Sequence, residues 1–142
     1  MNNKSVNSSS KNSVVSIITL LIVGFLFVTI FLQGVKIKQN NDMVSISGGL
    51  FYSAKFAYSD ISSIELRDSV EYGTRTNGVS LLNYKLGIFS NNEFGKYKLF
   101  VNDSIKKVII VKYDENTVVY NAKDEATTID TYNFLLEKSG LK

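Results

Sequence analysis

The chain has 142 residues, of which 16 are basic and 13 acidic, and it contains no His, Cys, Trp or Pro. The missing cysteines exclude disulfides and thiolate chemistry, and the missing histidines remove the most frequent general base and the commonest metal ligand. Lys4 and Lys11 precede a hydrophobic stretch, and the other 14 basic residues share the rest of the chain with all 13 acids. Such a balanced domain lacks the basic stripe of duplex-binding proteins, so we expect no nucleic-acid partner.

The N-terminal part divides into a polar tail and a long apolar segment. Residues 1–13 are rich in Asn and Ser, which predicts a disordered tail. Residues 14–35 contain no charged side chain. As a helix, residues 14–32 would extend about 28 Å, close to the ~30 Å hydrocarbon core of a bilayer. We therefore predict one transmembrane helix over residues 14–35, and a single-pass protein of the cell membrane.

Two other interpretations of the apolar segment remain open. A cleaved secretory signal would have an apolar region of about 7–15 residues and a small-residue cleavage site, which Phe31–Gly34 does not offer. A buried helix of a soluble protein is the third interpretation. The orientation is nearly undetermined, because Lys4 and Lys11 precede the segment and Lys36 and Lys38 follow it. The lack of a dense basic cluster after it favours a cytoplasmic tail and an extracytoplasmic domain.

After residue 40 the pattern becomes alternating apolar and polar, which is typical of half-buried strands. Gly, Asn and Asp separate the alternating runs, as in turns, and we place turns at 47–49, 76–78, 91–92, 102–104 and 114–116. About seven strands are predicted, around Val44–Ile46, Phe56–Tyr58, Ile64–Leu66, Tyr84–Phe89, Tyr97–Val101, Lys107–Tyr113 and Val118–Tyr120.

The C-terminal stretch has helical periodicity. Asp124 is suited to the N-cap and Gly140 can end the helix. Phe134 falls off the apolar stripe and is either exposed or packed under a loop. We predict a mainly β fold over residues 40–142, a partly open antiparallel barrel capped by this C-terminal helix. The stripe that would face the barrel consists of Ile129, Tyr132, Leu135 and Leu136.

Several short segments follow one another along this part of the chain. They are Gly48–Tyr52, Ser59–Ile61, Arg75–Gly78, Gly87–Phe89, Phe94–Tyr97 and Asn121. The order of the predicted elements resembles a pleckstrin-homology-like (PH-like) domain, and these segments resemble a bacterial family of such domains. The resemblance covers about Asp42 to Lys138. It implies a non-catalytic, membrane-associated module, and members of the family often lie beside transmembrane helices.

The sequence departs from lipid-binding eukaryotic relatives, in which a basic loop between the first two strands recognises phosphoinositides. Here residues 47–55 contain a single Lys, Lys55. One lysine attracts an anionic headgroup weakly, so we do not expect headgroup binding. The aromatic cluster Phe51, Tyr52, Phe56 and Tyr58 is interpreted as core, or else as a patch that docks a partner or the bilayer surface.

No catalytic, cofactor or metal site is predicted. Glu65, Asp68 and Glu71 lack the regular oxygen ligands and central Gly of a calcium loop. We predict a membrane-anchored binding or scaffolding module with a protein partner. The alternatives are an extracytoplasmic sensor or regulatory subunit of a transporter, and a lipid-binding domain. Arg75 could hold a carboxylate or phosphate, or could lie in a turn, solvated or paired with Asp68 or Glu71. The candidate partner-binding residues are Lys55, Arg75, Asn77 and Phe134.

Overall fold

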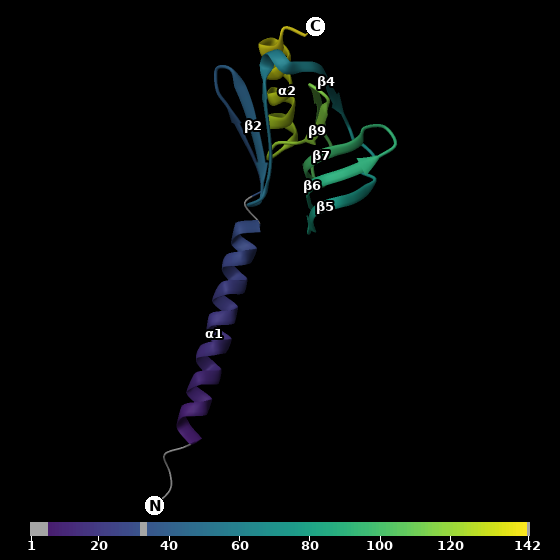
Figure 1. Cartoon of the computed structure of the whole chain (residues 1–142). Helices are drawn as coiled ribbons and strands as arrows, with labels where there is room; N and C mark the ends of the chain where they lie inside the picture. The colour runs from purple at the N-terminus through teal and green to yellow at the C-terminus, as the bar shows by residue number, and fades with distance from the viewer. Residues whose placement is uncertain (1–5, 32–33, 142) are drawn as a thin grey trace, which may run out of the picture. The chain divides into compact units, whose positions relative to one another are not determined.

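The computed structural model describes residues 6–31 and 34–141 (Figure 1), which fall into two compact units, Met1–Leu32 and Gln33–Lys142. The first unit is a single helix, α1 (Val6–Phe31). Helix α1 includes residues 6–13, which were expected to be disordered. The physical reason is that a helix nucleated by the apolar segment extends at low cost into the neighbouring residues. Residues 1–5 of the expected tail lie outside the described residues.

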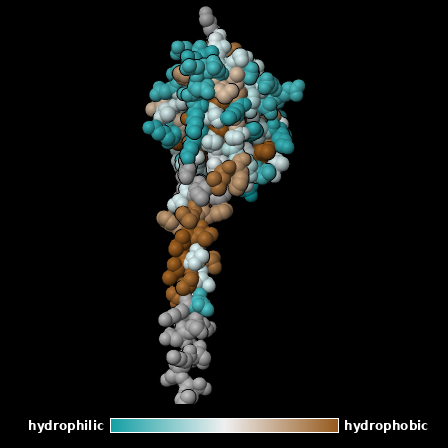
Figure 2. All heavy atoms as spheres, turned by 60° about the vertical axis from the view of Figure 1, so that its left-hand side comes forward, coloured by the Kyte–Doolittle hydropathy of each residue, from teal (hydrophilic) through white to brown (hydrophobic). Residues whose placement is uncertain are grey.

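Helix α1 is long and apolar enough to cross a membrane, by length and composition, and a signal sequence would meet the same criteria. The brown atoms along it in Figure 2 show this apolar surface. The hydroxyls of Ser16, Thr19 and Thr29 donate to backbone carbonyls three or four residues earlier, each at 2.9 Å. These side chains thus satisfy their polar groups within the helix, as a bilayer would require.

The second unit begins with a three-stranded antiparallel sheet of β1 (Val35–Gln39), β2 (Met43–Gly48) and β3 (Tyr52–Ala57). Strand β1 lies before residue 40, at which the sequence placed the start of the domain. The reason is that Val35 and Ile37 pack against the core and so belong to the folded unit.

A short 3-10 helix, η1 (Tyr58–Asp60), leads into a six-stranded sheet. The strand order in this sheet is β4-β8-β9-β7-β6-β5, with β7 and β9 parallel and every other neighbouring pair antiparallel. The mainly β fold with a C-terminal helix is confirmed, and residues 34–141 contain nine strands where about seven were predicted. The strands of this sheet are β4 (Ile61–Arg67), β5 (Thr74–Leu81), β6 (Tyr84–Asn91), β7 (Gly95–Asn102), β8 (Val108–Tyr113) and β9 (Asn116–Tyr120).

Strand β5 occupies a segment where a turn was predicted at residues 76–78, so that prediction was wrong. The register with β6 shifts between Arg75 and Asn77, and Gly78 lies opposite Gly87. A Cβ atom on either glycine would come within 2.3 Å of backbone oxygen on the other strand. Asn77 and Gly78 therefore belong to a bulge and to a close approach of two strands. Gly and Asn are found in bulges and close approaches as well as in turns, so the sequence alone does not distinguish them.

The central strands of the six-stranded sheet are buried on both faces. One face packs against the three-stranded sheet and α2 (Glu125–Ser139), with the rings of Phe56 and Tyr113 stacked at 4.6 Å. The other face is covered by Val70 and Tyr72 from the β4–β5 connection and by Phe94. The central strands consequently show near-continuous apolar runs instead of alternation, as strands covered on both sides do.

The β4–β5 connection is fastened to the face it covers. The hydroxyl of Tyr97 donates to the carbonyl of Tyr72 (2.8 Å), and the amide of Asn91 donates to that of Glu71 (2.6 Å). An ion pair with Lys107 holds Asp68 and lowers the pKa of its carboxyl. Within residues 6–31 and 34–141 no group of three or more acidic side chains could hold a metal ion.

Helix α2 (Glu125–Ser139) stands between the blue three-stranded sheet and the green strands in Figure 1. The Asp124 side chain accepts from the backbone N–H of Thr127 (2.7 Å), and Gly140 adopts φ 69°, so both predicted helix ends are confirmed. The buried face is Thr128, Thr131 and Leu135, whereas Ile129 and Leu136 of the predicted stripe are only half-buried. The prediction missed the threonines because their hydroxyls donate to carbonyls within the helix, which makes their burial inexpensive.

We predict that Leu135→Ala lowers the free energy of unfolding by about 2–5 kcal/mol, because it empties a fully buried site under α2. Half-buried Leu136 provides the control, and Leu136→Ala should cost clearly less. Urea unfolding of the chain in a mild detergent, followed by circular dichroism, measures both. Equal losses in the two variants would contradict the assigned face of α2.

The Tyr120 hydroxyl is fully buried and has no hydrogen-bond partner among the described residues. A buried unpaired hydroxyl costs about 1–3 kcal/mol, so Tyr120→Phe should be at least as stable as the natural chain at neutral pH. Burial also raises the pKa of Tyr120 above its ordinary value of 10.0. Above pH 10 the unfolded state therefore ionises first, and the folded state loses stability as the pH rises.

Tyr120→Phe removes that contribution. Above pH 10, the free energy of unfolding of the variant should therefore fall by about 1.4 kcal/mol less per pH unit than that of the natural chain. Unfolding curves at pH 7.5, 10 and 11 measure the difference. A variant that is destabilised at pH 7.5 would show that the hydroxyl has a partner after all.

Candidate binding site

The outer face of the three-stranded sheet carries lysines and serines. Alternation along β1, β2 and β3 turns Val44, Ile46, Ala54 and Phe56 toward the core. The intervening side chains lie on the opposite face. We call this surface the lysine–serine face, and it consists of Lys36, Lys38, Ser45, Ser47, Ser53 and Lys55.

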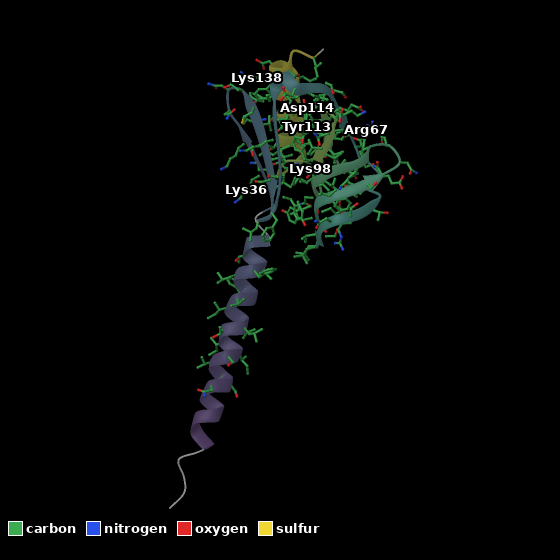
Figure 3. All side chains as sticks on the ribbon, in the orientation of Figure 1. Lys36, Arg67, Lys98, Tyr113, Asp114 and Lys138 are labelled. Atoms are coloured by element: carbon green, nitrogen blue, oxygen red, sulfur yellow. The ribbon has the colours of Figure 1, made fainter. Side chains whose placement is uncertain are left out.

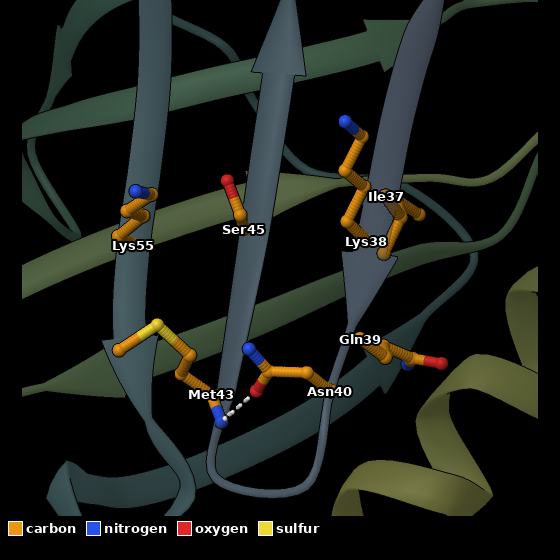
Figure 4. A pocket seen from close by; sticks show the side chains of 7 residues that line it. All are labelled: Ile37, Lys38, Gln39, Asn40, Met43, Ser45 and Lys55. Atoms are coloured by element: carbon orange, nitrogen blue, oxygen red, sulfur yellow. Dashed lines mark hydrogen bonds between the residues drawn. The ribbon is translucent and has the colours of Figure 1, made fainter.

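Two lysines and a serine form one row across this face. Lys38 pairs with Ser45, and Ser45 pairs with Lys55, so the two lysines are separated by two strand spacings, about 10 Å. The row lies in a hollow of about 750 Å³, and Figure 4 shows Lys38 and Lys55 on either side of Ser45. The remaining lining residues are Ile37, Gln39, Asn40 and Met43.

The β1–β2 turn at the end of the hollow is held by local hydrogen bonds. The Asn40 side-chain oxygen accepts from the backbone N–H groups of Asp42 (3.1 Å) and Met43 (2.8 Å), and the latter bond is drawn in Figure 4. The Tyr58 hydroxyl donates to the Asn40 carbonyl (3.1 Å). Burial and, to a lesser extent, the charge of Asp42 raise the pKa of Tyr58, so this hydroxyl stays protonated.

The charge in the hollow is positive. Among the ion pairs of the described residues, none involves Lys38 or Lys55. Ammonium groups and a hydroxyl on a rigid sheet can donate hydrogen bonds to a carboxylate or a phosphate. The arrangement is therefore suited to binding an anion.

Arg75 lies elsewhere, in a second hollow of about 800 Å³ beside β5 and β6. The residues that line it include Glu71, whose carboxylate opposes anion binding. Lys85, also in its lining, pairs with Asp103 and lies over the Tyr72 ring, 5.1 Å from the centroid. Pairing of Arg75 with Asp68 or Glu71, one of the alternatives left open by the sequence, is not among the ion pairs of the described residues. This hollow is the weaker candidate, because its charges are mixed.

The side chains of Asn77 and Phe134 make contacts within the domain. The Asn77 side-chain oxygen accepts from the Tyr52 hydroxyl (2.9 Å), which links β5 to the start of β3. Phe134 meets the ring of Tyr58 edge-on at 6.0 Å, and the Lys138 ammonium lies 5.7 Å from its centroid. Phe134 thus packs against η1. The four residues proposed from the sequence lie in separate places, and only Lys55 is in the lysine–serine face.

The sequence interpretation missed Lys38 and Ser45. Lys36 and Lys38 alternate with Val35 and Ile37, which is a strand pattern, but they were considered only as charges flanking the apolar segment. Recognising that alternation would have added the first strand. The row itself depends on the register of three strands, which single-strand patterns do not supply.

Comparison with known proteins identifies one family. The family model described as "Bacterial PH domain" matches residues 35–133, which runs from the first residue of β1 into α2. Neither a curated protein nor a solved structure matches the chain. The match covers both sheets and therefore the whole lysine–serine face.

Proposed function

Because the chain belongs to the bacterial PH domain family, whose members are generally non-catalytic binding modules, we propose that it binds an acidic segment of a protein partner at a membrane. The observation that carries the proposal is the row of Lys38, Ser45 and Lys55, with two ammonium groups on one rigid face and no carboxylate partner among the described residues.

The spacing of the row suits an extended peptide. A peptide in the extended polyproline II conformation has three residues per turn and rises about 3.1 Å per residue, so carboxylates three residues apart lie on the same side, about 9 Å from each other. That distance matches the separation of Lys38 and Lys55 across two strand spacings. Ser45 adds a hydrogen-bonding group between them, and Met43 gives the hollow an apolar edge for the aliphatic parts of a peptide.

A lipid headgroup is the less favoured ligand of this face. Each surface lysine contributes about 1 kcal/mol of attraction to an anionic membrane, and salt screens that attraction. A headgroup site needs several donors that converge on one phosphate, whereas Lys38 and Lys55 are spread across the sheet.

We further propose that α1 anchors the domain in the membrane. Its window of Asn12–Thr29 is uncharged and exposed along its length. The absence of a dense basic cluster after the helix supports a cytoplasmic N-terminus and an extracytoplasmic domain.

The anchor makes a direct prediction. Full-length protein should sediment with membranes, resist extraction with alkaline carbonate, and keep residues 1–13 when its N-terminus is sequenced. Recovery of a soluble chain that begins near residue 34 would identify α1 as a cleaved signal instead.

The lysine row makes a second prediction. Lys38→Glu/Lys55→Glu should weaken binding of a labelled Gly/Ser peptide carrying two Asp residues three positions apart by tenfold or more, because tenfold corresponds to only about 1.4 kcal/mol. Fluorescence anisotropy with the full chain in detergent measures it. Lys96→Glu/Lys112→Glu is the matched control, with the same change of charge on β7 and β8.

Equal weakening in the two double variants would reduce the interaction to net charge and contradict the proposed site. Absence of peptide binding, together with saturable binding of the natural chain to phosphatidylserine or phosphoinositide vesicles that the Lys38/Lys55 variant loses, would assign the face to lipid.

A further inference from the structure

Two turns of the domain expose large apolar side chains. In the β2–β3 turn Leu50 and Phe51 are 60% and 76% exposed. At the β5–β6 turn Leu81, the last residue of β5, and Leu82 are 43% and 77% exposed. We call these four residues the apolar rim. Within the described part of the domain, Met43 is the other large apolar side chain of this kind.

The two turns lie at the same end of the domain. Val35 pairs with Gly48, and Gly48 with Tyr52, so the β2–β3 turn is beside the first residue of β1. Near the β5–β6 turn, the Tyr84 side chain approaches Gly34 so closely that a Cβ there would lie 3.3 Å from its hydroxyl. Both turns therefore adjoin residues 34 and 35, where the chain enters the domain.

The chain enters that end directly from α1. Residues 32–34 are the only ones between Phe31 and Val35. At no more than about 3.6 Å per residue, this connection spans at most about 14 Å. If α1 crosses a bilayer, as the proposed function holds, the rim end of the domain cannot move far from the membrane surface.

Leu82 occupies a position that ordinarily suits another residue type. Its φ is 51°, in the left-handed region that Gly and Asn adopt most readily. A leucine here gains no burial from the domain itself, since it is 77% exposed. An exposed apolar side chain in such a turn is consistent with a contact outside the domain.

The charges at the two ends agree with one orientation. The opposite end gathers Asp42, Asp60 and Asp114, because the N–H of Tyr58 donates to the Asp42 carbonyl (3.1 Å) and that of Asp114 to the Asp60 carbonyl (3.3 Å). Figure 3 shows Asp114 at the end of the domain far from Lys36.

At the rim end, the acidic side chains of Asp103 and Asp124 have partners within the domain. Asp103 pairs with Lys85, and Asp124 caps α2. An anionic membrane surface therefore repels the far end of the domain and tolerates the rim end. In Figure 2 brown and tan atoms gather at the lower edge of the domain, whereas teal predominates above.

We propose that the apolar rim inserts into the interface of the bilayer that α1 spans, so that the domain rests on the membrane through its β2–β3 and β5–β6 turns. The occupant of this surface is lipid, in the region where apolar side chains meet headgroups. This seating rests on the anchor of the proposed function but adds a second contact with the membrane. Lys38 is three residues beyond Val35 along β1, so the lysine–serine hollow remains about 10 Å above the rim and accessible to a protein.

Spin labelling tests the seating, and the natural absence of cysteine makes each introduced label unique. Full-length Phe51→Cys and Leu82→Cys chains carry a nitroxide and are reconstituted into phosphatidylcholine/phosphatidylglycerol vesicles. Collision rates with oxygen, which concentrates in lipid, and with a water-soluble nickel chelate are then compared. We expect both labels to show oxygen-to-nickel ratios several-fold above those of matched labels at Asn41→Cys and Glu115→Cys, in turns at the opposite end.

A label at Val23→Cys, inside α1, separates failure of the seating from failure of the anchor. If Val23 is in lipid while positions 51 and 82 resemble 41 and 115, the seating is wrong and the anchor stands. If Val23 itself is in water, the anchor fails and the seating fails with it. Labels at 51 and 82 that are shielded from both reagents and broadened by a second spin would assign the rim to another copy of the chain and overturn the proposal. All of these positions are exposed, and circular dichroism verifies that each labelled chain is folded.

Discussion

The six-stranded sheet is apolar on both faces, and the rest of the domain is arranged to cover it. Along β8, Val108 and Ile110 face one side while Ile109 and Val111 face the other, and all four are buried. One side needs the three-stranded sheet and α2, and the other needs the β4–β5 connection. The three-stranded sheet covers the six-stranded sheet with its apolar face, so its polar face is exposed to solvent. The lysine–serine face exists for that reason.

Patterns confined to one segment could be predicted from the sequence. Asp124 and Gly140 define the ends of α2 through local hydrogen bonding and backbone conformation, and the β8 and β9 runs are apolar enough to identify as strands. Strand β5 could not be recognised, because Asn77 and Gly78 signal a turn and a bulge alike. Its bulge is specified by the close pairing of Gly78 with Gly87, nine residues further along the chain on the neighbouring strand.

The candidate site depended still more on distant pairing. Lys55 was identified by its isolation in a segment otherwise without charge, but its partners in the row come from two other strands. Phe134 departs from the helical stripe, and the sequence left open whether it is exposed or packed under a loop. The neighbouring ring of Tyr58 belongs to η1, a 3-10 turn that no periodicity marks, and that ring accounts for the position of Phe134.

Asn121, one of the positions that resemble the family, has a structural role. Its buried amide accepts from the backbone N–H of Asn102 (2.8 Å) and donates to the carbonyls of Asn102 (3.0 Å) and Ile105 (3.3 Å). A polar group without water must find such partners, so one side chain fixes the path of the β7–β8 turn against the end of β9.

The parallel pairing of β7 with β9 also constrains the order in which the chain can fold. Strands β5 to β7 form a meander of sequential hairpins, and β8 with β9 forms another hairpin, so each of these pieces needs only short loops. The seam between Leu99 and Val119 can close only when the two pieces meet, and β4 must then reach β8 across more than forty residues. Closing loops of this length costs entropy before any contact repays it. We therefore expect the joining of these two local units to be the slow step of folding, and substitutions along the seam to affect the folding rate more than substitutions within either hairpin.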